Sequence, residues 1–151
     1  MSRPLVRLHR TAGVAAGLII LVFLTVSALS ELNGDPDMIR RAKTAIAWGL
    51  IALVPALMIT GASGMRLGKG WKGPAIAAKK RRMALVAANG MLILVPSALA
   101  LAWLARQGET GAAFAIVQTV EFLAGGTNLL LIGLNARDGI AMTRRRTAGM
   151  A

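Results

Sequence analysis

The chain contains no cysteine and only one histidine, His9. The lack of thiols excludes disulfide exchange, thiolate metal sites and cysteine nucleophiles. A six-coordinate b-type haem generally takes two strong axial ligands, and here the second would have to be a methionine or the His9 of another subunit. We therefore predict no cofactor, and the composition does not favour haem.

The sequence also lacks the residue patterns of common catalytic and metal sites. Paired catalytic carboxylates, a Ser/His/Asp arrangement and zinc-binding spacings are missing. The acidic run at 31–37 does not have the alternating oxygen ligands of a calcium-binding loop, so we interpret it as a solvated turn and predict no metal. The glycine-rich segment 64–74 lacks the Gly-Lys-Ser/Thr ending of a phosphate-binding loop. These absences favour a role other than that of an enzyme.

What the chain has in abundance is apolar sequence, since 56% of its 151 residues are hydrophobic and the mean hydropathy is +0.62. A bilayer core of about 30 Å needs a helix of roughly 20 residues. Four apolar runs of that order lie at about 11–30, 44–63, 84–105 and 112–135, joined by connections too short for a soluble domain. We therefore predict an all-α integral membrane protein, a single domain over 1–151 whose four transmembrane helices form an antiparallel bundle.

Two features refine these predicted spans. The first run is longer than the roughly 7–15 apolar residues of a secretory signal, so we expect it to remain as a span. Pro55 and Pro96 lie inside the second and third runs. Each removes a helix hydrogen bond and crowds the carbonyl four residues earlier, which predicts two kinks.

The 18 lysines and arginines are distributed unevenly between the two sides of this predicted membrane domain. Most of them precede the first run, lie between the second and third, or follow the fourth. The first and third connections contain four of the six acidic residues, together with the basic residues Arg40, Arg41, Lys43 and Arg106. The positive-inside rule then places both termini in the cytoplasm, which predicts a multi-pass protein of the cell inner membrane.

The basic clusters are also the predicted contacts of the bilayer's anionic phospholipids, because positive charge near a membrane surface attracts such lipids. The predicted lipid contacts are Lys69, Lys72, Lys79, Lys80, Arg81 and Arg82. Nucleic acid is not a predicted partner, because Trp71 is the one aromatic residue interleaved with the basic clusters.

The fourth run carries polar residues on one stripe of a helix. Steps of three and four residues align Gln118, Glu121, Gly125, Asn128, Ile132 and Asn135. Only Ile132 is apolar, so the stripe should face other helices, and Asn89 of the third run is a further donor that could face it. The predicted intramembrane polar site consists of Glu121, Gln118, Asn128, Asn89 and Asn135.

Glu121 is the residue of this stripe that most needs a physical reason. An isolated carboxylate in hydrocarbon costs about 2.5 kcal/mol or more. We therefore expect Glu121 to be shielded from both water phases, to be protonated at neutral pH, and to accept hydrogen bonds from Gln118, Asn89 or Thr127. Gly125 and the amides of the stripe, such as Asn128, should be buried, whereas Phe122 and Leu130 should face lipid.

Three functions are compatible with these patterns. The first is an accessory or interaction subunit, in which the polar stripe packs within the bundle, in a homo-oligomer or in a larger membrane complex. The second is a small proton-linked transporter that uses Glu121, because intramembrane acids are functional candidates. The third is a lipid-, quinone- or haem-binding redox subunit, for which the sequence offers His9 and Glu121.

Overall fold

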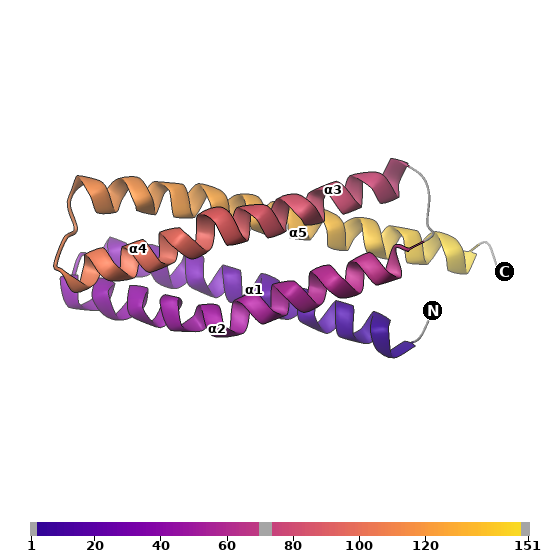
Figure 1. Cartoon of the computed structure of the whole chain (residues 1–151), viewed down its shortest axis with the longest axis horizontal. Helices are drawn as coiled ribbons and strands as arrows, with labels where there is room; N and C mark the ends of the chain where they lie inside the picture. Colours follow the sequence, from indigo (N-terminus) through magenta and orange to yellow (C-terminus); the bar gives the residue numbers. More distant parts are fainter. Residues whose placement is uncertain (1–2, 70–73, 149–151) are drawn as a thin grey trace.

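The computed structural model describes the backbone of residues 3–69 and 74–148 and the side chains of residues 3–69 and 76–141. Within these ranges the chain is all-α, with four long apolar helices in a packed bundle, each long enough to span a membrane (Figure 1). The elements are α1 (Arg3–Asn33), α2 (Pro36–Leu67), α3 (Pro74–Asn89), the π-helical segment η1 (Gly90–Leu94), α4 (Val95–Arg106) and α5 (Ala112–Ala148). α3, η1 and α4 together make the third crossing, and α1 begins at the same end of the bundle at which α5 ends (Figure 1).

The turn between α1 and α2 is shorter than the sequence suggested. Gly34 has a φ of 75°, a left-handed conformation that glycine adopts without strain. Asp35 caps α2 by accepting a hydrogen bond from the Asp37 N–H at 3.0 Å, and Pro36 occupies the start of the helix, where a missing N–H costs nothing. The helix α2 therefore begins before the expected span at about 44–63, and Lys43 lies inside α2 and not in a loop.

The interior of the bundle is built from regularly spaced side chains. On α2, Ile39, Ile46, Leu50 and Leu53 are buried, and together with Lys43 they follow steps of four and three residues. This stripe packs against buried residues of α1, α4 and α5. Because lipid is as apolar as these side chains, close packing and interhelical hydrogen bonds hold membrane helices together more than hydrophobic burial does.

The close approach of α1 to α5 depends on a glycine. A Cβ added at Gly125 would lie 2.8 Å from Leu24 Cδ2, so α1 fits against α5 because no side chain intervenes. Gly126, the next residue, has no atom within 4 Å of the equivalent position and lies on the outer side of the helix. Leu130 is 64% exposed on that outer side, as predicted, whereas Phe122 is half-buried.

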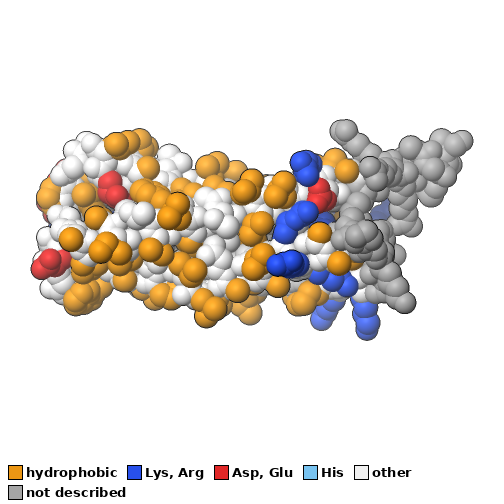
Figure 2. All heavy atoms as spheres, turned by 90° about the horizontal axis from the view of Figure 1, so that it is seen from above, with side chains coloured by type: hydrophobic (Ala, Val, Ile, Leu, Met, Phe, Trp, Pro, Cys, Tyr) orange, Lys and Arg blue, Asp and Glu red, His pale blue; other side chains and the backbone are white. Residues whose placement is uncertain are grey.

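The outer surface is apolar along most of its length and basic at one end. Figure 2 shows hydrophobic side chains over this face, with lysine and arginine gathered at the end where α1 begins and α5 ends. Large apolar side chains such as Leu18, Leu92 and Ile116 are each more than half exposed. The length and composition of the four helices are those of a multi-pass membrane protein whose sides contact a lipid bilayer.

The third crossing is interrupted where Pro96 lies. Residues 90–94 form a π-helical turn in which the Val95 N–H bonds to the Gly90 carbonyl, five residues earlier. Pro96 has no N–H to donate and crowds the carbonyl of Leu92, so the wider turn accommodates it. Pro55 lies inside the continuous α2. The kinks expected at the two prolines remain predictions.

Candidate functional site

Lys43 is the centre of a buried polar cluster at the end of the bundle where α1 turns into α2. Its side chain is 0% exposed. Its ammonium donates hydrogen bonds to the Ser27 hydroxyl of α1 and to the Gln118 amide oxygen of α5. Nζ also lies 2.9 Å from Glu31 Oε1 and 3.4 Å from Glu121 Oε2. The cluster therefore joins α1, α2 and α5 through one cation.

Four further contacts complete the surroundings of the Lys43 cluster, which we define as Ser27, Glu31, Lys43, Gln118 and Glu121. The Lys43 ammonium lies 5.6 Å from the centre of the Phe114 ring, within the range of a cation–π interaction. The Ser27 hydroxyl lies 3.4 Å from Glu31 Oε1 and 3.4 Å from Glu121 Oε2. The Gln118 amide donates to Glu121 Oε2 at 3.1 Å. Among the residues whose side chains are described, every buried polar side-chain atom has a hydrogen-bond partner.

Glu121 is thus buried, but it is not isolated as the sequence analysis assumed. Of the three donors expected for it, Gln118 fills the role, whereas Asn89 and Thr127 do not. The Thr127 hydroxyl instead bonds to the Leu123 carbonyl of its own helix at 2.7 Å. Lys43 is in contact with Glu121, so this carboxyl group has a basic partner inside the bundle, and its expected protonation at neutral pH stays a prediction.

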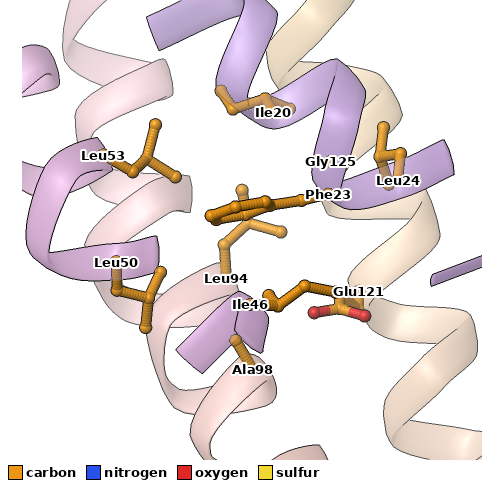
Figure 3. Close-up of a pocket in the computed structure, with 10 residues that line it drawn as sticks. All are labelled: Ile20, Phe23, Leu24, Ile46, Leu50, Leu53, Leu94, Ala98, Glu121 and Gly125. Atoms are coloured by element: carbon orange, nitrogen blue, oxygen red, sulfur yellow. The ribbon is translucent and has the colours of Figure 1, made fainter. Parts of the chain in front are cut away.

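A cavity of about 30 Å³ adjoins the cluster on the side toward the middle of the bundle. Its walls are apolar residues of α1, α2, η1, α4 and α5, and Glu121 is the one polar residue among them (Figure 3). Figure 3 shows the Glu121 carboxylate at the edge of this space, with Phe23 and Ile46 beside it. A space of this size has room for about two water molecules.

A second polar layer lies about two turns further along α5. Asn128 is fully buried, as predicted, and its Oδ1 accepts a hydrogen bond from Asn89 Nδ2 at 2.8 Å. Asn89 also donates to the Ala124 carbonyl at 2.8 Å, and Asn128 donates to the Val86 carbonyl at 3.3 Å. These bonds tie α3 to α5 without any charged group.

The remaining residue of the predicted polar site, Asn135, belongs to a third layer near the opposite end. Arg82 Nη1 lies 2.6 Å from Asp138 Oδ2 and 3.3 Å from Asn135 Oδ1. The Arg82 and Asp138 side chains are 22% and 26% exposed. The structure therefore brings Gln118 and Glu121 together in one layer and Asn89 and Asn128 in a second, with Asn135 in a third.

The predicted lipid contacts are not equivalent in the structure. Lys69, Lys80 and Arg81 are exposed, Lys79 is half-buried, and Arg82 is engaged by Asp138. Lys72 lies outside the described residues. The contact of these residues with anionic lipid remains a prediction. The exposed Lys69, Lys80 and Arg81 are the residues for which this contact is best supported.

His9 lies in the bundle near the same end. Its Nδ1 is 3.1 Å from the Thr60 carbonyl and 3.0 Å from the Ser63 hydroxyl, so the ring joins α1 to α2. Within the described parts of the chain, no group of three or more histidine, aspartate or glutamate residues is arranged to hold a metal ion.

Lys43, Ser27 and Glu31 are the cluster members that the sequence analysis missed. A pattern in the sequence identifies Lys43, because it lies four residues after Ile39 and three before Ile46, in step with the apolar face of α2. Comparison with protein-family models, with curated protein sequences and with solved structures finds no match to this chain.

Proposed function

We propose that this chain is a small accessory protein of the cell inner membrane, a single four-helix domain with both termini in the cytoplasm. It acts through lateral contacts with lipid and with the helices of partner subunits. The observation that supports this proposal is that the polar face of α5 is saturated inside the chain's own bundle. Gln118, Glu121 and Asn128 are at most 7% exposed, and their hydrogen bonds all go to the same chain.

The internal polar layers have a consequence for how partners would be recognised. Association of two copies through the stripe of Glu121 and Asn128 would require breaking bonds that the single chain already makes. Partner helices are therefore expected on the outer sides of the bundle. Gly126 and Gly133, one heptad apart on α5, have no side chain packed over them, and such positions allow a second helix to approach closely.

The basic end of the bundle supports the proposed orientation. Lys69, Lys80 and Arg81 are exposed at the end where α1 begins and α5 ends, whereas the opposite end carries Asp35, Asp37 and Glu109. Positive residues at the cytoplasmic side orient polytopic proteins and attract anionic phospholipid headgroups. Both effects would hold the accessory protein at a fixed depth and direction beside its partners.

Cysteine crosslinking in native membranes tests this proposal, because the chain has no thiol of its own. A Gly126→Cys variant should form adducts of higher mass with a thiol-reactive crosslinker, and Ala124→Cys, at a buried position two residues earlier on α5, serves as the inward-facing control. Native mass spectrometry of the extracted protein should show the same partner or a second copy. A monomer in both measurements would contradict the accessory role.

A proton-linked carrier is the second candidate, and the Lys43 cluster is the observation that favours it. A cation between two carboxylates beside a small cavity resembles the arrangement expected of a proton relay. Glu121→Gln separates the two candidates, since it keeps the size and hydrogen-bonding ability of the side chain. In an accessory protein the variant should assemble and function nearly as the wild type does, whereas in a carrier it should assemble but lose pH-dependent transport.

A further inference from the structure

The charges of the Lys43 cluster do not balance. One ammonium, on α2, contacts two carboxylates, Glu31 on α1 and Glu121 on α5. With all three groups ionised the cluster carries one net negative charge. Lys43 and Glu121 are buried away from water, where an uncompensated charge is costly and a group usually gains or loses a proton instead.

No other charged side chain in the described residues is placed to compensate for this charge. The part of α4 that packs here is apolar and includes the buried Leu101 and Ala105. The charged residue of α4, Arg106, is exposed and bonds to the Thr44 hydroxyl at 3.5 Å. On α2, Arg40 is exposed and pairs with Asp37 at 2.7 Å. The excess charge therefore remains within the cluster.

The geometry also provides a connection between the two carboxylates. The Ser27 hydroxyl is equally distant, at 3.4 Å, from one oxygen of Glu31 and one oxygen of Glu121. A hydroxyl donates one hydrogen bond and accepts others. It can accept the proton of one carboxylic acid while donating its own to the other carboxylate, which moves one proton across without any change in charge.

Exposure decreases along this connection. The Glu31 side chain is 26% exposed, that of Glu121 is 9% exposed and that of Lys43 is 0% exposed. Glu31 lies in the last turn of α1, next to the turn that joins α1 to α2. Water at that end of the bundle can therefore reach Glu31, while Glu121 adjoins the cavity lined by apolar residues.

We propose that the Lys43 cluster is a binding site for one exchangeable proton, shared between Glu31 and Glu121 through the Ser27 hydroxyl. A hydronium ion at the open end transfers its proton to the Glu31 carboxylate and leaves water. Glu31 then passes a proton to Ser27 as Ser27 passes its own to Glu121, and the reverse sequence releases it. Lys43 keeps its ammonium throughout and positions both carboxylates. This site operates within one chain and is independent of the partner contacts proposed above.

Infrared spectroscopy of the purified full chain in lipid vesicles tests the proposal, and six acidic residues in the sequence make the assignment tractable. At pH 7 the wild type should show the carbonyl stretch of one protonated carboxyl group, shifted in D₂O. Glu31→Gln and Glu121→Gln should each abolish it, because either change leaves one carboxylate beside Lys43, a neutral pair that needs no proton. Glu109→Gln, at an exposed carboxyl group outside the cluster, should leave it unchanged.

Ser27→Ala tests whether the proton moves through the Ser27 hydroxyl, separately from whether the cluster binds a proton. The protonated-carboxyl signal should persist in this variant, but its shift after transfer to D₂O should be slower than in the wild type. Absence of the signal from the wild type at pH 7 would overturn the proposal without any variant. If the protonated-carboxyl signal survived in either Glu→Gln variant, the proton would not be shared between Glu31 and Glu121. If the signal shifted in D₂O as fast in Ser27→Ala as in the wild type, the proton would not pass through the Ser27 hydroxyl.

Discussion

Among the residues whose side chains are described, two ion pairs connect α5 to earlier helices, one near each end of the bundle, and they differ strongly in burial. Lys43 contacts Glu121 at 3.4 Å with a fully buried ammonium, whereas Arg82 contacts Asp138 at 2.6 Å with both side chains about a quarter exposed. Figure 2 places the lysine and arginine side chains of the second end at the surface. The pair with the shorter distance is therefore the more solvated one.

The comparison shows why distance is a poor guide to the importance of a charge pair. In water the attraction between two unit charges is weak and screened, and holding two long side chains in place offsets much of it. Inside the bundle neither Lys43 nor Glu121 has water to return to, so each depends on the other. Removing one partner should consequently matter far more at the Lys43 end than at the Arg82 end.

The largest effect is expected for Lys43→Met, which would leave Glu31 and Glu121 without the cation that contacts both. Breaking a buried pair by removing one partner costs about 3–5 kcal/mol. The measurement is the free energy of unfolding in mixed detergent micelles, followed by circular dichroism. Arg41→Met, at an exposed basic residue two positions earlier on α2, is the control and should change little. Equal stability of the two variants would remove the distinction between the ion pairs.

An intermediate effect is expected for Asn128→Ala, because this layer is buried but uncharged. The change leaves the Asn89 amide without its Asn128 partner, a loss of about 1–3 kcal/mol in the free energy of unfolding. Asn135→Ala is the matched control, since Asn135 accepts one bond from the partly exposed Arg82. A cost for Asn128→Ala as large as that for Lys43→Met would show that burial alone, without charge, sets the order of effects.

The smallest effect is expected for Arg82→Met. Water can replace the guanidinium around Asp138, so the unfolding midpoint should remain close to that of the wild type and of Arg81→Met. High salt should reduce even the residual difference. A loss of stability comparable with that of Lys43→Met would mean that the basic end of the bundle is less accessible to water than its surface suggests.

Much of the fold could be predicted because it depends on the hydropathy and spacing of many residues together. Four apolar runs of membrane length, the polar stripe on α5 and the turn at Gly34 are all properties of composition and spacing. The burial of Asn128 and the exposure of Leu130 followed from the same stripe. These features tolerate an error of a few residues in where a helix starts.

The partners within the site could not be predicted in the same way. Hydropathy falls at charged residues and therefore predicts Lys43 in a loop. The cap at Asp35 nevertheless starts α2 before these charged residues. Glu31 was placed in a solvated turn for the same reason. Which side chains meet depends on how three helices cross, and no stripe on a single helix contains that information. The in-step position of Lys43 with Ile39 and Ile46 was the one available signal.

The π-helical turn at 90–94 changes the spacing of the inward-facing residues along the third crossing. Its inward positions Val86, Gly90, Leu94 and Ala98 succeed one another at steps of four, whereas a regular helix with 3.6 residues per turn alternates threes and fours. The two halves of this crossing are therefore out of phase by part of a turn, and one hydrophobic period does not describe both.

The two halves of the third crossing also pack against different sets of helices. α3 packs against α5 and directs Asn89 toward Asn128, while α4 packs against both α2 and α5 with the small, apolar Ala98. Deleting one residue from 90–94 would restore a regular period, and the two flanking halves would keep nearly the same facing, because the π-helical turn already accommodates the extra residue. The wider turn thus lets both the amide-bearing and the apolar halves of the third crossing face the interior of the bundle.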